Sequence, residues 1–189
     1  MARYAFENDP KRLGFTLARY KHTAKLLSGK RNVLEVGCSD GFGSRIVRQH
    51  VGRLTALDID PIAIEEAEAN SSPSWPIEFR VYDFLSAPVT GFDAVYALDV
   101  FEHIPDDAGL LARMREAADV AIIGTPSLES QRYASPLSMA GHINCKSGEE
   151  LRAAMAVHWR HVFMFGLNDE TFHTGFLPMA QYLFAMGVA

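Results

Sequence analysis

Apolar residues along the first thirty positions recur with the spacing of one helix face. The members of this stripe are Leu13, Leu17, Tyr20, Ala24 and Leu27. Their intervals of 4, 3, 4 and 3 residues predict an amphipathic helix. Asp9–Pro10 places a capping acid and a proline at its start, and Ser28–Gly29 ends it.

After this helix, short β-branched or apolar runs alternate with helical segments. The predicted strands are 32–36, 53–57, 77–81, 92–98, 120–123, 161–165 and 182–188. The predicted helices are 43–50, 61–70, 106–118 and 147–158, the last with a capping box from Ser147 to Glu150. This alternation is typical of an α/β fold, a Rossmann-like doubly wound sheet of seven mostly parallel strands. No helix is expected between the last two strands, so we predict that they form an antiparallel edge hairpin.

The length of 189 residues fits a single domain. Within it we expect an N-terminal helical segment over 1–30 that acts as a lid, a cofactor-binding core over 31–125, and acceptor-side loops with the edge hairpin over 126–189. In open α/β sheets, ligands bind beyond the carboxyl ends of the strands. The loops at that edge are therefore where function is expected.

Composition and charge narrow the class of protein. No run approaches the roughly 20 apolar residues of a membrane span, and the N-terminus has no signal-peptide core. Two cysteines, Cys38 and Cys145, form neither a disulfide framework nor a C-x-x-C motif, so we expect a cytoplasmic protein. The net charge of -5 makes nucleic acid an unexpected partner, although residues 1–31 hold 8 of the 18 lysines and arginines and only two acids. The oligomeric state stays open.

The strongest motif is VLEVGCSDGFGS at 33–44. A strand carrying Glu35 runs into a glycine-rich turn with Gly37, Gly41 and Gly43, followed by a helix. Glycines allow close backbone approach to a ligand, and a helix N-terminus offers unpaired N–H groups. The spacing does not give the G-x-G-x-x-G fingerprint of dinucleotide sites. An acid before the turn instead suits a ligand that bears an amine.

The chain here resembles the class I S-adenosylmethionine-dependent methyltransferases, in a branch similar to ubiquinone-biosynthesis-type O-methyltransferases. Their pattern E/D-x-G-x-G-x-G is met by Glu35, Gly37, Gly41 and Gly43, with Ser39 where the middle glycine usually stands. The run FDAVYALDVFEHIP at 92–105 resembles the fourth-strand motif of that branch.

The resemblance implies S-adenosyl-L-methionine as the cofactor. It assigns Asp58 to the ribose hydroxyls and Asp83 to the adenine amino group, with Phe84 beside the ring. Ile59, Leu98 and Asp99 complete the expected cofactor contacts. Independently of the family, a carboxylate such as Asp58 can accept two hydrogen bonds from a cis-diol. Aromatic residues that could face the cationic sulfur are Tyr4, Phe42, Phe84 and Phe101.

Three histidines fall in loops at the expected active edge: His103, His142 and His173. A hydroxyl or amine acceptor gains from a base that titrates near neutral pH. We expect His103 and His142 to be catalytic. A second interpretation makes Asp99, Glu102, His103 and His142 the ligands of a divalent metal ion that polarises an acceptor oxygen, since similar D/E-x-x-E-H spacings bind metal in small-RNA 3′-end 2′-O-methyltransferases.

The long segment from Thr125 to Lys146 is expected to be functional. Its polar residues Ser127, Ser130, Gln131, Arg132 and Tyr133, with Asn168, Asp169 and Thr171 opposite, suggest a polar small-molecule acceptor such as a sugar or a nucleotide-linked metabolite. The alternatives left open are metal-assisted 2′-O-methylation of RNA ends, a nicotinamide-dependent oxidoreductase, and a nucleoside-binding module without catalysis.

Overall fold

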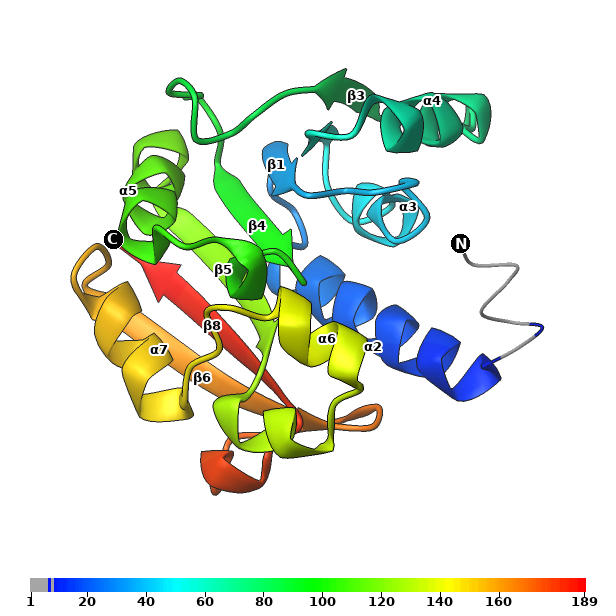
Figure 1. The fold of residues 1–189 in the computed structure, drawn as a ribbon. Coiled ribbons are helices and arrows are strands. Elements are labelled where there is room, and N and C mark those ends of the chain that lie inside the picture. Colours follow the sequence, from blue (N-terminus) through cyan, green and yellow to red (C-terminus); the bar gives the residue numbers. More distant parts are fainter. Residues whose placement is uncertain (1–6, 8) are drawn as a thin grey trace.

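A computed structural model describes residue 7 and residues 9–189, and within this range eight strands form one sheet. The strands are β1 (Asn32–Val36), β2 (Arg53–Asp58), β3 (Glu78–Val81), β4 (Ala94–Leu98), β5 (Val120–Pro126), β6 (His161–Asn168), β7 (Thr171–His173) and β8 (Tyr182–Val188). Their spatial order is β3-β2-β1-β4-β5-β8-β6-β7. The first five are parallel, which confirms the predicted doubly wound arrangement (Figure 1).

The C-terminal strands are antiparallel, as predicted, with two differences of detail. Strand β8 inserts between β5 and β6 and pairs antiparallel with both, so it lies inside the sheet. The edge is formed by β7, a three-residue strand that the sequence pattern does not predict. Three residues carry too little periodicity to identify a strand from sequence. The sheet therefore has eight strands where the pattern predicts seven.

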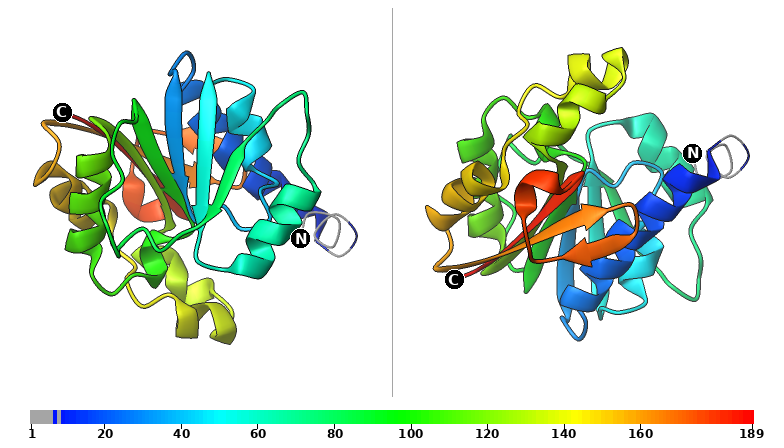
Figure 2. Two further views of the ribbon diagram at one scale, coloured as in Figure 1. Left: turned by 90° about the horizontal axis from the view of Figure 1, so that it is seen from above. Right: turned by 90° about the horizontal axis from the view of Figure 1, so that it is seen from below.

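Helices cover both faces of the sheet (Figure 2). The α-helices are α2 (Pro10–Leu26), α3 (Ser44–Arg48), α4 (Pro61–Ala69), α5 (Asp107–Ala117), α6 (Pro136–Gly141) and α7 (Gly148–Ala156). Short 3-10 helices are η1 (Phe101–His103), η2 (Leu128–Tyr133) and η3 (Leu177–Met179). The predicted capping box of Ser147 and Glu150 is present at the start of α7.

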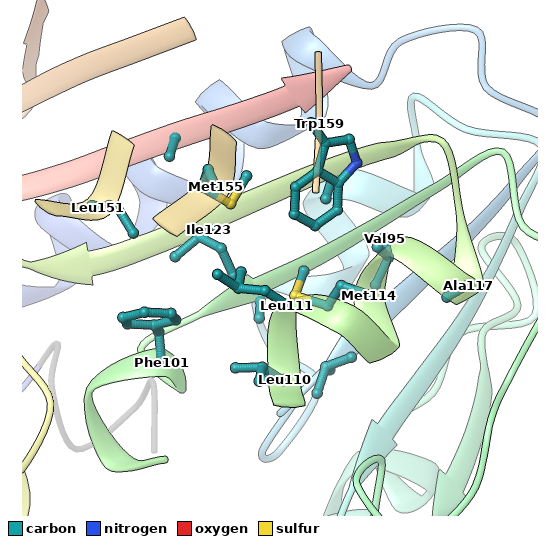
Figure 3. Close-up of a cluster of buried hydrophobic side chains, with 14 of the residues drawn as sticks. Val95, Phe101, Leu110, Leu111, Met114, Ala117, Ile123, Leu151, Met155 and Trp159 are labelled. Carbon is teal, nitrogen blue, oxygen red and sulfur yellow. The ribbon is translucent and has the colours of Figure 1, made fainter. Parts of the chain in front are cut away.

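The largest core cluster lies between the sheet and α5 and α7. Figure 3 shows Leu110, Leu111 and Met114 of α5 facing Leu151 and Met155 of α7. All are at most 1% exposed, and full burial of such a side chain contributes about 1.5–3 kcal/mol. Strand β4 is buried along its whole length, as expected for a parallel strand covered on both faces.

Helix α2 packs on the opposite face, together with α3. Asp9 caps it by accepting a hydrogen bond from the Arg12 backbone N–H at 3.1 Å, as the sequence predicts. The predicted buried face of this helix is only partly correct, because Leu17 is 36% exposed while Thr23 is fully buried. Residues 1–6 and 8, which include Tyr4, lie outside the described residues, and the lid expected of the N-terminal segment stays a prediction. Among the described helices, none is long and apolar enough to cross a membrane.

Candidate active site

The glycine loop after β1 takes a shape that explains its glycines. Gly37 has φ +77° and Gly41 has φ +68°, a left-handed region that favours glycine. A Cβ at Gly41 would lie 2.7 Å from the Phe79 ring. Ser39, which stands where the family pattern has a glycine, is also left-handed at φ +49°. The position thus keeps the conformation that a glycine would adopt.

The start of α3 is closed by a side chain from α2. A Cβ added to Gly43 would overlap the ring of Tyr20, so only glycine permits this approach. Gly43 is the N-cap of α3, which begins at Ser44 and is shorter than predicted.

Glu35 lies beneath this loop and is 1% exposed. Burial raises the pKa of its carboxyl to about 7, against the opposing effect of the Ser44, Tyr96 and Tyr20 hydroxyls around it. Neither carboxyl oxygen makes a hydrogen bond of ordinary geometry, and the same holds for Ser44 Oγ and the Tyr96 hydroxyl. The acid therefore sits in a buried polar cluster with unused hydrogen-bonding capacity.

Asp58 ends β2 beside the glycine loop. Its Oδ2 accepts a hydrogen bond from the Ser39 backbone N–H at 2.8 Å, and its Oδ1 accepts one from the Asp60 N–H at 3.0 Å. A carboxylate has about four acceptor positions, so each oxygen can accept a further bond. The neighbouring Ile59 is 71% exposed. The arrangement offers two acceptors next to an apolar surface.

The next strand end carries Asp83, whose side chain is exposed and caps the Leu85 N–H at 2.9 Å. Phe84 and Leu98 are each 4% exposed and belong to the core clusters. Phe101 is fully buried and Phe42 is half-buried. Of these five predicted residues, Asp83 and Phe42 present surface at the strand ends.

Asp99 follows β4 in a left-handed conformation, with φ +56°. Arg19 Nη1 of α2 donates to both of its carboxylate oxygens, at 2.9 and 2.8 Å. The guanidinium carbon of Arg19 lies 3.9 Å from the centre of the Tyr182 ring. Sequence reasoning missed Arg19 and Tyr182, because no local motif brings residues 80 positions apart together.

Glu102, three positions later, is buried at 1% exposure. It accepts a hydrogen bond from the Thr125 hydroxyl at 3.1 Å. Burial, and then the nearby Asp99 charge, raise the pKa of its carboxyl well above the ordinary range. A buried acid of this kind favours either a proton or a cation as its partner.

His103 and His142 face each other near Glu102, with ring centroids 5.2 Å apart. His103 Nδ1 lies 2.8 Å from the Gly141 carbonyl oxygen, and His142 Nδ1 lies 3.0 Å from Gln131 Oε1. Because these oxygens only accept, Nδ1 is the donor in each contact, and in a neutral imidazole Nε2 then keeps the lone pair. Burial, and then His103, lower the pKa of His142.

Ligand atoms of Glu102, His103 and His142 all lie within 4.8 Å of one another, a group able to hold a metal ion. Asp99, the fourth expected ligand, lies outside this group and pairs with Arg19 instead. His173 is also apart from it, on β7, where it packs against Gly166. The structure thus brings together three of the five histidine and acid candidates.

The polar residues of the 125–146 segment are largely used within the protein. The buried Ser127 donates to the Ala180 carbonyl at 2.6 Å, and Ser130 donates to the Ser127 carbonyl at 2.8 Å. Across from them, Asn168 accepts from the Gln181 N–H at 2.9 Å. Gln131 is the member of this set that contacts the histidine pair. Tyr133, beneath the Arg132 guanidinium, is 78% exposed.

A separate open depression of about 450 Å³ includes Lys30, Arg31 and Asp93 in its lining. These residues precede β1 and β4, at the amino ends of the strands. The depression is therefore at the opposite edge from the glycine loop and the histidines, and we do not assign it to the site.

Comparison with known proteins agrees with this geometry. Residues 34–119 match a family model described as a methyltransferase domain. A ubiquinone biosynthesis O-methyltransferase of Xanthomonas oryzae pv. oryzae (strain PXO99A) is 33% identical over 107 residues, which is 54% of this chain and 42% of that protein. The chain thus matches less than half the length of that curated relative.

Solved structures share this fold over most of the chain. The methyltransferase domain of bacterial CtHen1-C superposes with a TM-score of 0.76 at 14% identity, covering 92% of this chain and 98% of that one. Magnesium protoporphyrin IX methyltransferase from Synechocystis PCC 6803, solved with bound S-adenosylmethionine, gives 0.68 at 14% identity, covering 100% and 84%. Residues 34–119 are therefore similar to a methyltransferase domain, and the chain shares the α/β Rossmann-like fold of these methyltransferase structures.

Proposed function

We propose that this protein transfers a methyl group from S-adenosyl-L-methionine to a hydroxyl of a polar small-molecule acceptor. The observation that carries the proposal is one shared edge of the sheet: the glycine loop and Asp58 lie at the ends of β1 and β2, and the Glu102, His103 and His142 group lies at the end of β4. The residues expected to bind the cofactor and those expected to accept a proton therefore lie at the same edge of the sheet.

The residues present fit the cofactor. Asp58 has unused acceptor positions for a ribose diol, and exposed Ile59 adjoins it. Gly37 and Gly41 allow the loop to turn tightly at the end of β1, where a ligand could approach its backbone. When bound, the cofactor supplies a methyl group on a positively charged sulfur.

His103 and His142 would handle the acceptor proton. Each ring has Nδ1 fixed by an oxygen, so Nε2 is the atom that can take a proton from a hydroxyl. Burial, and then the nearby His103, lower the pKa of His142, which favours its neutral form. Positioning of the acceptor against the methyl supplies much of the remaining rate enhancement. Methylation of oxygen agrees with the name of the O-methyltransferase relative.

The test begins with calorimetry of the purified chain against S-adenosylmethionine, S-adenosylhomocysteine and NAD. Binding of the first two and not of NAD is expected, and the reverse result would favour an oxidoreductase. Transfer of a radioactive methyl group into the small-molecule fraction of a cell extract then separates an enzyme from a nucleoside-binding module. Cofactor binding without any methylated product would contradict the proposal.

Metal-assisted methyl transfer is a second candidate, favoured by the compact group of Glu102, His103 and His142. Two imidazoles with free Nε2 atoms and one carboxylate are suitable ligands for a divalent cation. The ion would polarise the acceptor oxygen. Comparing a small catechol with an RNA oligonucleotide bearing a free 3′ end, each with and without Mn²⁺, separates a small-molecule enzyme from one acting on RNA ends.

A further inference from the structure

Helix α2 places two consecutive side chains in two different parts of the site. Tyr20 packs over Gly43 and faces Glu35 at the glycine loop. Arg19, one residue earlier, binds the Asp99 carboxylate at the end of β4. Two adjacent residues of α2 therefore contact the glycine loop after β1 and the turn after β4.

The Arg19 contact is built from more than an ion pair. Its side chain is 21% exposed, and its guanidinium lies over the face of Tyr182. The Tyr182 hydroxyl in turn accepts a hydrogen bond from the Asp99 backbone N–H at 3.2 Å. Side chains from α2 and β8 thus hold both the carboxylate and the backbone of the same residue.

Asp99 is held in a left-handed backbone conformation, with φ +56°. A left-handed φ is uncommon for residues other than glycine and persists where surrounding contacts enforce it. Its N–H also donates to the Gly124 carbonyl at 3.0 Å. The next residue of β5, Thr125, donates to Glu102. The turn that carries Glu102 and His103 therefore begins at Asp99, whose backbone and side chain are both fixed by hydrogen bonds.

We propose that Arg19 is a positioning residue, which acts through Asp99 to fix the turn that carries Glu102 and His103. Helix α2 then contributes to the geometry of the site in addition to packing on the sheet. This inference rests on the proposed function for its catalytic meaning, while the positioning itself is a property of the folded chain alone.

Helix α2 offers a matched control. Lys11 pairs with Asp169 at 3.5 Å, with both side chains largely exposed. Both ion pairs join α2 to a loop that follows a strand, but only the Arg19 pair reaches the turn after β4. Lys11→Ala should leave that turn unchanged, since exposed ion pairs contribute little.

Amide hydrogen exchange of the full chain, without added cofactor, tests the positioning directly. Arg19→Ala should speed exchange of the Asp99 and His103 amides about tenfold or more relative to Lys11→Ala, with the Gly37 and Cys38 amides unchanged. Asp99→Asn, which keeps the shape and removes the charge, should do the same. Arg19→Lys should restore an intermediate rate, because lysine keeps the charge without the flat guanidinium. Equal exchange in Arg19→Ala and Lys11→Ala would overturn the proposal, as would a uniform rise over the whole chain.

Activity separates this proposal from the proposed function. Arg19→Ala should lower methyl transfer about tenfold or more while the dissociation constant for S-adenosylhomocysteine changes less than threefold, and Arg19→Lys should recover part of the rate. Full activity of Arg19→Ala would contradict positioning. A wild-type chain that neither binds S-adenosylhomocysteine nor transfers methyl would contradict the proposed function, and the exchange rates would still decide the role of Arg19.

Discussion

The imidazoles of His103 and His142 meet at 70° with their centroids 5.2 Å apart, one presented by η1 after β4 and the other by the end of α6. The Gly141 carbonyl oxygen at the end of α6 contacts Nδ1 of His103. Gln131 Oε1 of η2 contacts Nδ1 of His142. This pairing brings two oriented imidazoles from separate segments of the chain to one place.

We expect His103→Ala to lower kcat about 10²–10⁴-fold, the usual contribution of general acid–base catalysis. The dissociation constant for S-adenosylmethionine should hardly change, because the expected ribose and adenine contacts lie elsewhere. Steady-state kinetics with calorimetry checks both. His161→Ala, at an exposed position at the start of β6, is the control. Full turnover by His103→Ala would move the assignment to His142.

Asp58→Asn should weaken S-adenosylmethionine binding about 10- to 150-fold, which is the loss of about 1.5–3 kcal/mol expected for a hydrogen bond to a charged group. Calorimetry measures the change. Glu68→Gln, an exposed acid on the neighbouring α4, should bind as the wild type does. An unchanged affinity in folded Asp58→Asn would remove the ribose assignment.

If a cation occupies the Glu102, His103 and His142 group, Mn²⁺ should bind with one ion per chain, and EDTA should remove activity that Mn²⁺ or Mg²⁺ then restores. Glu102→Gln and His142→Ala should each weaken Mn²⁺ binding about 10- to 100-fold, measured by calorimetry. Asp169→Asn, an exposed acid on the β6–β7 turn, is the control. Activity that is insensitive to EDTA would leave the histidines as bases only.

Glu35 should make the free energy of unfolding fall as pH rises. Its pKa is about 7 in the folded chain and near 4.5 when unfolded, so between these values the folded state holds a proton that the unfolded state releases. The loss is fully developed above pH 7 and amounts to about 3 kcal/mol. Denaturant unfolding at pH 5 and pH 7.5 should therefore show a smaller decrease for Glu35→Gln than for the wild type. An identical pH dependence would mean that Glu35 ionises normally.

His22 should act in the opposite direction. It stacks on Phe172 with ring centroids 3.7 Å apart, and burial lowers its pKa to about 4. The unfolded chain binds a proton near pH 6.5 that the folded chain does not, so stability is lost as pH falls from about 6.5 towards 4. His22→Phe keeps the aromatic contact and should remove this loss, measured by thermal unfolding at pH 5 and pH 7. Equal acid sensitivity of the variant would place His22 in contact with water.

Local sequence patterns are sufficient for most of the elements and for the cofactor edge. Asp9 and Ser147 do cap helices, and β4 is the buried apolar strand that its composition predicts. Parallel strands place their carboxyl ends at one edge, so the sequence alone leads one to expect the glycine loop and Asp58 together. These features depend on neighbours in the chain or on a fold-wide rule.

Only the tertiary structure decided which distant side chains meet. Three side-chain contacts join separate segments, and the periodicity of the sequence does not encode them. They are the Arg19–Asp99 ion pair, the stacking of Arg19 on Tyr182 and the contact of Gln131 with His142. The same reason explains why Asp99, predicted as a metal ligand, lies outside the Glu102, His103 and His142 group. It also explains why Phe84, predicted beside the adenine ring, lies in the core. The sequence by itself predicted most of the strands and helices and the edge where a ligand is expected. The packing of α2, α6 and β8 decided which side chains at that edge lie together, because that depends on contacts made only when the whole chain is folded.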